Sequence, residues 1–151
     1  MSHHEFPLII GYGNPLRSDD GVGWHAAERL RARLAGRAEV VTCHQLMPEL
    51  AEALSRAKRA FLIDASVTGE PGRIQVQPLV PATTASQPLT HHLDAGALLA
   101  LALALYGACA ETTQISVSGA SFDHGERLSP AVEAALPALL ERVGQLVGGS
   151  R

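Results

Sequence analysis

The sequence has 151 residues, of which 46% are hydrophobic and 18% are charged, with a formal net charge of −3. This length and composition are typical of one globular domain with a substantial core, so we expect a single domain over residues 1–151, frayed at 1–5 and 148–151. The acidic balance, with no cluster of basic residues, argues against a nucleic-acid-binding surface.

The first half of the chain predicts three strands separated by helices. A strand at 7–11 leads through a turn rich in glycine, asparagine and proline into a helix at 21–35, whose apolar residues recur with helical spacing. A second strand at 39–43 is followed by a short helix at 48–57 with proline in its first turn. The run 59–65 is apolar on both faces, which predicts a central parallel strand.

The second half predicts two more strands and two more helices. The strict alternation of 73–77 indicates a half-exposed edge strand. A helix at 91–106, capped by Thr90, is apolar all round and is expected to be buried. A last strand at 112–119 precedes a helix that opens at Ser129-Pro130. This alternation predicts an α/β three-layer sandwich: a twisted, mostly parallel five-stranded sheet with one antiparallel strand and helices on both faces.

No segment predicts export, membrane insertion or a disulfide framework. The start of the chain lacks the basic region of a signal peptide, and the apolar run at 95–110 is too short and alanine-rich for a membrane span. Two cysteines, Cys43 and Cys109, are too few for a metal knuckle and indicate no disulfide framework. We therefore expect a cytoplasmic protein without a membrane partner, and we expect it to be a monomer.

The stretch from Gly11 to Gly23 holds two adjacent carboxylates at a helix start. Asp19 and Asp20 are good N-cap residues, and the helix dipole stabilises negative charge there. One cap satisfies a helix start, so the second carboxylate indicates a site, although a capped helix start with no further role stays an alternative. A phosphate-binding loop is disfavoured, because the pattern is not Gly-x-Gly-x-x-Gly and two carboxylates repel a phosphate.

Several of these polar residues converge in the predicted fold. Asp19 and Asp20 follow the first strand, Asp64 ends the third, and His91 or His92 starts a helix. The carboxyl ends of neighbouring strands meet in one crevice of an open α/β sheet. Two carboxylates and an imidazole there make a mixed oxygen and nitrogen site for a borderline divalent metal, although each residue also has a structural alternative as a cap or packing residue. Two more histidines lie in predicted loops and are candidates for a second role: His44 and His124.

Four motifs in chain order carry a family resemblance. They are Gly11-x-Gly-Asn-x-Leu-x-x-Asp-Asp-Gly-x-Gly23, Phe61-Leu-Ile-Asp-Ala65, Thr90-His91-x-Leu93, and Ser116-Val-Ser-Gly119 leading to Gly125-x-x-Leu-Ser129. Together they cover nearly the whole chain, which resembles the hydrogenase maturation protease family. These endopeptidases trim the C-terminus of the large subunit of nickel–iron hydrogenase.

The resemblance implies a hydrolase that removes the C-terminal peptide of a hydrogenase large-subunit precursor after nickel insertion. It implies a largely parallel sheet with helices on both sides, and the family's metal-contacting residues map onto Asp20, Asp64 and His91. The nickel would be carried by the precursor, with no resident organic cofactor. We favour His91 over His92 because Thr-His-x-Leu fits the family motif, and the next residue points about 100° away around a helix. No catalytic residue is assigned: Asp19 would either cap the helix, which we prefer, or position a water as general base.

Two other functions stay open from the sequence. A non-catalytic metal-sensing or interaction module would keep the fold and lack cleavage. A peptidyl-tRNA hydrolase also opens with Gly-x-Gly-Asn-Pro, but that enzyme needs a His-Asn pair shortly after the motif and a basic groove. Here His25 is followed by Ala26 and the net charge is −3, which argues against binding of tRNA.

Overall fold

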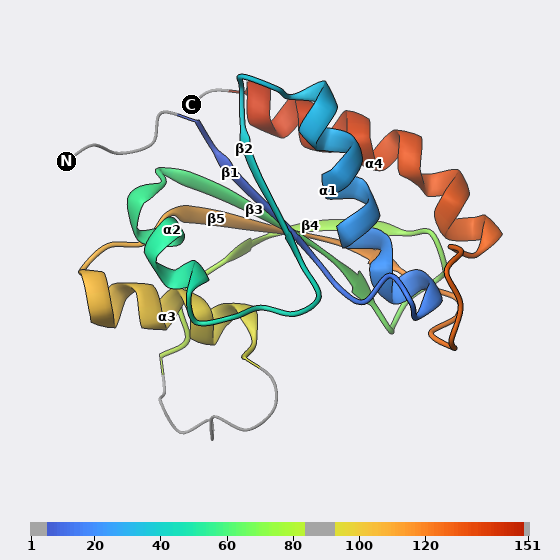
Figure 1. Cartoon of the computed structure of the whole chain (residues 1–151), viewed down its shortest axis with the longest axis horizontal. Helices are drawn as coiled ribbons and strands as arrows, with labels where there is room; N and C mark the ends of the chain where they lie inside the picture. The colour runs from blue at the N-terminus through green and yellow to red at the C-terminus, as the bar shows by residue number, and fades with distance from the viewer. Residues whose placement is uncertain (1–5, 84–92, 150–151) are drawn as a thin grey trace.

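The computed structural model describes residues 6–83 and 93–149 of the chain (Figure 1). Five strands lie in these residues: β1 (Leu8–Tyr12), β2 (Glu39–Cys43), β3 (Arg59–Ser66), β4 (Ile74–Leu79) and β5 (Glu111–Ser118). The same residues form four α-helices: α1 (Val22–Arg33), α2 (Leu50–Arg56), α3 (Ala95–Tyr106) and α4 (Pro130–Gly148). A short 3-10 helix, η1 (Ser18–Gly21), directly precedes α1. The order of elements is the one that the sequence predicts.

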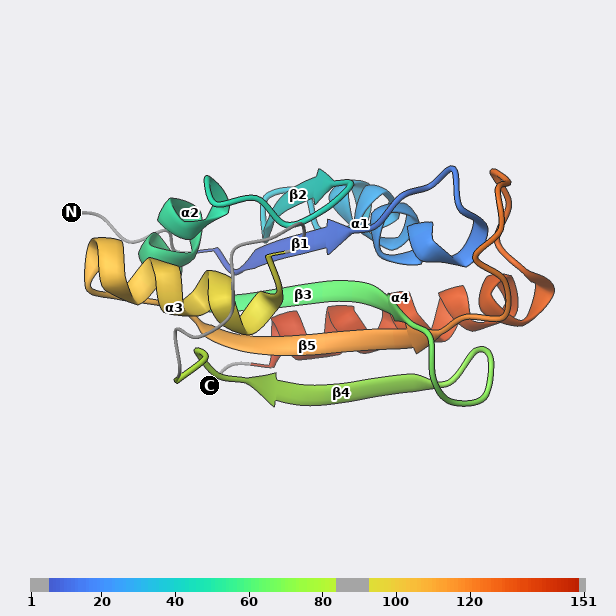
Figure 2. The same ribbon diagram turned by 90° about the horizontal axis from the view of Figure 1, so that it is seen from below.

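The five strands form one sheet in the order β2-β1-β3-β5-β4 (Figure 2). The first three and β5 are parallel, and β4 pairs antiparallel with β5 at the edge. The predicted fold is thus confirmed, with the apolar run 59–65 in the centre and the alternating segment 73–77 at the edge. From β1 the chain winds to β2 on one side and then to β3 on the other. An open α/β sheet has its crevice where this reversal occurs, at the carboxyl ends of β1 and β3.

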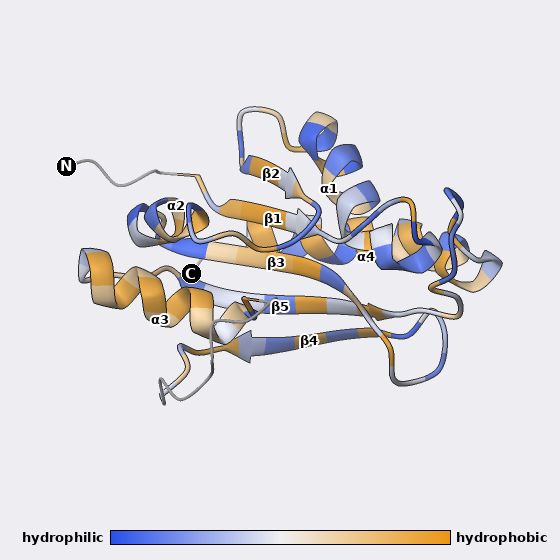
Figure 3. Cartoon of the chain, turned by 60° about the horizontal axis from the view of Figure 1, so that its bottom comes forward, coloured by the Kyte–Doolittle hydropathy of each residue, from blue (hydrophilic) through white to orange (hydrophobic). Residues whose placement is uncertain are grey.

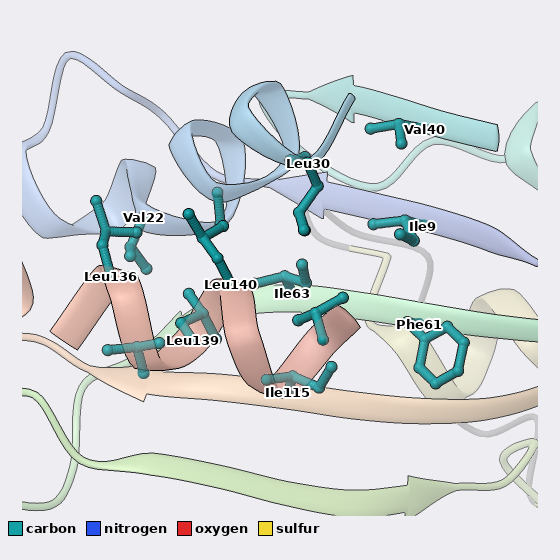
Figure 4. Packing of buried hydrophobic residues seen from close by; sticks show 14 of the residues in the cluster. Ile9, Val22, Leu30, Val40, Phe61, Ile63, Ile115, Leu136, Leu139 and Leu140 are labelled. Atoms are coloured by element: carbon teal, nitrogen blue, oxygen red, sulfur yellow. The ribbon is translucent and has the colours of Figure 1, made fainter. Parts of the chain in front are cut away.

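Helices cover both faces of the sheet: α1 and α4 lie on one face, and α2 and α3 lie on the other (Figure 1). Because side chains alternate along a strand, Ile9 and Ile63 belong to the core under α1 and α4, whereas Ile10 and Leu62 belong to the core under α2 and α3. Figure 4 shows the first of these cores. All four side chains are fully buried, and each stabilises the fold by roughly 1.5–3 kcal/mol. The two cores therefore fix the strand ends that carry the site.

The first turn of α1 lies against the sheet at two glycines. A Cβ on Gly23 would overlap the carbonyl oxygen of Ile63, and a Cβ on Gly11 would overlap the carbonyl oxygen of Gly23. Any side chain at these positions would push the helix away from β1 and β3, so the close approach requires glycine. The contact brings η1, which carries Asp19 and Asp20, to the ends of these strands.

The helix predicted at 91–106 starts later, at Ala95. Its N-cap is Asp94, whose side chain accepts a hydrogen bond of 2.8 Å from the backbone N–H of Ala97. The expected cap, Thr90, lies outside the described residues. Aspartate is the better N-cap of the two residue types and directly precedes the alanine- and leucine-rich run, so the predicted start at residue 91 is wrong.

The prediction that this helix is buried all round is wrong at its C-terminal end. Leu98 and Leu99 are fully buried, whereas Leu103, Leu105 and Tyr106 are 44%, 62% and 52% exposed. As part of an outer layer, α3 packs on the sheet with one side only, and its apolar outer side stays at the surface (Figure 3). None of the helices described is both long enough and apolar enough to cross a membrane.

Candidate active site

A cavity of about 480 Å³ opens at the carboxyl ends of β1 and β3. It lies at the crevice that the strand order predicts. Asp20 of η1 and Asp64 of β3 both line it, so the structure brings these two predicted carboxylates together. The remaining wall comes from the loops after β1 and β2, the end of β3 and the start of α3: Tyr12, Gly13, Asn14, Arg17, His44, Gln45, Leu46, Ala65, Leu93, Asp94 and Ala95.

Asp64 is held by side chains from both neighbouring strands. The register places Ser116 of β5 opposite Asp64, and Tyr12 follows the last β1 residue that pairs with β3. The Ser116 hydroxyl donates to Oδ1 of Asp64 at 2.7 Å, and the Tyr12 hydroxyl donates to Oδ2 at 3.1 Å. The side-chain amide of Gln114 donates in turn to the Tyr12 oxygen at 3.2 Å. The Asp64 carboxylate therefore has a fixed orientation where it lines the cavity.

Burial and nearby charges shift the pKa values of Asp64 and Tyr12. Burial raises the pKa of Asp64, hydrogen bonds from Ser116, Tyr12 and Gln114 oppose that rise, and the charge of Asp20 adds to it. Burial, with the charge of Asp64 as the next cause, raises the pKa of Tyr12, so its phenol stays protonated and acts as a donor. A cation in the cavity would relieve the repulsion between the two carboxylates.

Asp20 orders the turn that precedes it. Its Oδ2 accepts a hydrogen bond of 2.8 Å from the backbone N–H of Asn14, whose own side-chain oxygen accepts from the backbone N–H of Leu16 at 2.9 Å. Gly13 has a φ of 139°, and a Cβ there would overlap the carbonyl oxygen of Asp20, so the tight turn requires glycine. The turn closes onto Asp20 and keeps its carboxylate at the edge of the cavity.

Asp19 is fully buried and is not part of the cavity wall. Its Oδ1 accepts from the backbone N–H of Ser129 at 2.7 Å, and its Oδ2 accepts from those of Ala120 at 2.7 Å and Ser121 at 3.1 Å. The preferred prediction that Asp19 caps the following helix is wrong, because neither η1 nor α1 has a side-chain cap. Asp19 instead fastens the connection between β5 and α4. Since both of its oxygens are engaged there, the geometry also argues against a water-positioning role.

The predicted imidazole falls on a part of the chain that is not described. His91 and its alternative His92 lie within 84–92, outside the described residues. Among the residues that are described, no three histidine, cysteine, aspartate or glutamate side chains group as a metal site. His44, one of the two loop histidines singled out from the sequence, lines the cavity. The third metal contact at position 91 stays a prediction.

The two cysteines are free thiols. Cys43 ends β2, Cys109 lies just before β5, and both are partly buried. Burial raises the pKa of both thiols, which disfavours the nucleophilic thiolate near neutral pH. Neither cysteine therefore has the character of an activated nucleophile.

Sequence reasoning missed the side chains that support Asp64. Tyr12 comes two residues after Ile10, so strand alternation alone places it on the same sheet face, at the end of the strand. Ser116 and Gln114 alternate in the same way along β5. Their contact with Asp64 depends on the register between β3 and β5, which no signal in either segment encodes.

Comparisons with solved structures group the chain mainly with one kind of protein, although no protein-family model and no curated relative matches it. The hydrogenase maturating endopeptidase HybD from E. coli is 26% identical, with a TM-score of 0.77 over 91% of this chain and 89% of that chain. The hydrogenase 2 maturation peptidase from Thaumarchaeota archaeon SCGC_AB-539-E09 is 22% identical, with a TM-score of 0.72 over 95% and 99%. The NiFe hydrogenase maturation protease HycI from Thermococcus kodakarensis is 21% identical, with a TM-score of 0.74 over 95% and 93%. The last two establish a shared fold.

Proposed function

We propose that this chain, which belongs to the hydrogenase maturation protease family and is a peptidase, acts on the large-subunit precursor of a nickel–iron hydrogenase. It removes the C-terminal peptide of that precursor once nickel has been inserted. The observation that carries the proposal is the meeting of Asp20 and Asp64 in one cavity at the ends of β1 and β3. This cavity has the two oxygen donors that recognition of a precursor-bound metal needs.

In this proposal the nickel is part of the substrate. Asp20 and Asp64 supply carboxylate oxygens from η1 and β3, and His91 supplies an imidazole nitrogen. Such a mixed set of oxygen and nitrogen donors suits a divalent transition metal. Three protein contacts leave positions on the metal for the precursor's own ligands, so the enzyme holds nickel only as the precursor presents it. Binding then couples cleavage to metal insertion, since an empty precursor offers no metal to hold.

The chain's own residues act by positioning. Ser116 and Tyr12 fix the Asp64 carboxylate, and Asn14 fixes Asp20, so the two donors stand ready in one arrangement. A nickel held in that arrangement places the nearby scissile bond of the precursor, and such orientation lowers the entropic part of the barrier to hydrolysis. The protonated thiols of Cys43 and Cys109 give no support to a covalent intermediate.

We expect processing to depend on nickel in the precursor and not on metal in the enzyme. Enzyme and nickel-loaded precursor are treated separately with a chelator, freed of it and mixed, and the size of the large subunit is followed on a gel. Stripping the enzyme should leave processing unchanged, because two aspartates and one histidine without the helical His-Glu-x-x-His motif hold free metal weakly. If stripping the enzyme abolishes processing and zinc restores it, the protein is an ordinary resident-metal protease.

We expect alanine at position 91 to reduce kcat/KM for the nickel-loaded precursor by at least about tenfold, because it removes a direct contact to the metal and even outer-shell losses cost this much. His92→Ala should keep wild-type activity. His44→Ala is the matched control, since this histidine lines the cavity without a proposed contact to nickel. If only His92→Ala loses activity, the assignment of the metal contact to His91 from the Thr-His-x-Leu motif is wrong. Full activity in both variants would remove the imidazole from the proposal.

A further inference from the structure

Apart from Ser116, which fixes Asp64, the fourth sequence motif has no part in holding the nickel. It brackets the connection from β5 to α4, residues 119–129, which lies beside the loop after β1. The two loops are joined by hydrogen bonds between residues 101 to 110 positions apart in the chain. A surface connection held this firmly needs an explanation beyond linking a strand to a helix.

Ser18 and Asp19 make most of these bonds. The backbone N–H of Ser18 donates to the carbonyl oxygen of Gly125, and its hydroxyl donates to that of Asp123, both at 2.8 Å. The backbone N–H of Gly125 donates back to the carbonyl oxygen of Leu16 at 2.9 Å. The Asp19 side chain adds three more bonds, from Ala120 and Ser121 at one end of the connection and from Ser129 at the other. The connection is therefore fixed along most of its length.

Backbone strain accompanies this fixation. Ser18 has a φ of 54°, in the left-handed region that non-glycine residues avoid. Strained residues persist where the surroundings enforce them, and they concentrate at functional sites. The two hydrogen bonds of Ser18 to residues 123 and 125 supply that enforcement. The surface between the two loops is thus preformed.

A hollow of about 540 Å³ lies on this surface, lined by Arg17, Phe122, Asp123 and His124. Its volume falls within the range of roughly 300–1,000 Å³ that is usual for ligand sites. Arg17 also lines the cavity of Asp20 and Asp64, so the hollow and the cavity share one wall. The Arg17 Nε donates to the carbonyl oxygen of Phe122 at 3.2 Å, which joins the two sides of the hollow.

We propose that this hollow binds the C-terminal peptide of the precursor, the segment that cleavage removes. The inference rests on the proposed function, in which the nickel-bearing side of the scissile bond occupies the cavity of Asp20 and Asp64. The peptide on the other side of that bond has to leave the cavity. The hollow beyond Arg17 adjoins the cavity and is held in a fixed shape, so it receives this segment.

The lining suits an extended peptide. Arg17 carries guanidinium N–H donors for a peptide carbonyl or carboxylate oxygen. Phe122 is half-buried and offers apolar surface, while the exposed His124 offers a polar contact at the edge. This gives His124, the second loop histidine singled out from the sequence, a place in substrate binding rather than in metal binding.

Binding is measured with two nickel-free forms of the large subunit, the full precursor and a form without its C-terminal peptide, so that affinity is observed apart from cleavage. The wild-type protein should bind the full precursor about tenfold more tightly, a difference of about 1.4 kcal/mol. Phe122→Ala and His124→Ala should bind both forms alike. Phe6→Ala, at an exposed phenylalanine that belongs to neither cavity, is the control and should keep the preference. Thermal melting checks that each variant is folded.

Parallel processing of the nickel-loaded precursor separates this inference from the proposed function. Loss of the preference in His124→Ala, which is exposed and leaves the core intact, supports the subsite even where Phe122→Ala fails to fold. If the wild-type protein binds the full precursor and the form without the C-terminal peptide with equal affinity, the subsite is overturned, even if the nickel-loaded precursor is processed. A preference without processing supports the subsite and contradicts the proposed cleavage. A wild-type protein that binds neither nickel-free form also overturns the subsite, whereas the proposed function fails only if the nickel-loaded precursor is not processed.

Discussion

Asp64→Asn is expected to lower kcat/KM for the nickel-loaded precursor by at least about a hundredfold, because loss of an outer-shell partner alone costs ~10–100-fold and Asp64 is a proposed direct contact. Asparagine keeps the shape of the side chain but removes the charge. It also places an N–H₂ group where Asp64 now accepts from Ser116 or Tyr12, so one donor would face another. Processing is measured as the size shift of the large subunit at several precursor concentrations.

Asp94→Asn is the matched control for this substitution. Asp94 lines the same cavity, but its carboxylate caps α3. Asparagine is as good an N-cap as aspartate, so this variant should fold normally and stay within about fivefold of wild-type activity. Equal losses in the two variants would mean that general negative charge in the cavity, and not a specific contact of Asp64, supports processing. Wild-type activity in Asp64→Asn would contradict the proposed site.

The second large effect is on stability. Asp19→Asn is expected to lower the free energy of unfolding by about 3 kcal/mol, because a backbone N–H that donates to this buried side chain loses its acceptor and the remaining bonds lose charge assistance. One amide oxygen cannot replace two carboxylate oxygens that accept from Ser129, Ala120 and Ser121. Urea unfolding at pH 7 measures the difference. Asp123→Asn, at an exposed position on the same connection, should change stability little.

The stability difference between wild type and Asp19→Asn should depend on pH in a defined direction. Burial by itself would raise the pKa of Asp19, but hydrogen bonds from Ser129, Ala120 and Ser121 outweigh it, so the pKa in the folded state lies below its ordinary value. Because the pKa of Asp19 is lower in the folded state than in the unfolded state, its ionised carboxylate stabilises the fold at pH values above the unfolded-state pKa of about 3.9. This stabilisation is lost as the pH falls toward the pKa of the folded state. The difference should therefore be constant at neutral pH and shrink below about pH 4. A difference that grows on acidification would contradict this role.

The sheet could be predicted because its signals are local. The apolar run Phe61–Ile63 marks a strand covered on both faces, and the alternation from Ile74 marks an edge strand, so both places in the sheet follow from short segments. The meeting of Asp20 and Asp64 follows from strand order in the same way. The predicted start of α3 was wrong because threonine is also a possible N-cap, and the prediction used Thr90, whereas the side chain that caps the helix is that of Asp94.

The buried half of the site could not be predicted, because its contacts are long-range. Tyr12 reaches Asp64 across 52 positions of the chain, and Ser116 reaches it across another 52. Asp19 stands where a helix cap is expected, and only the folded structure shows that its partners lie on another loop. The two neighbouring aspartates of this motif therefore have different roles. Asp20 lines the cavity, whereas Asp19 holds the connection between β5 and α4.

The long reach of Asp19 also bears on the order in which the site is completed. The ribosome synthesises the chain from the N-terminus onward, so the first motif emerges well before Ser129. Ser129 is a hydrogen-bond partner of Asp19 that lies 110 positions later in the chain. Until then the carboxylate of Asp19 has only water as a partner, and burying it unpaired would be costly. The loop beside the cavity therefore settles only after β5 and the start of α4 have been made.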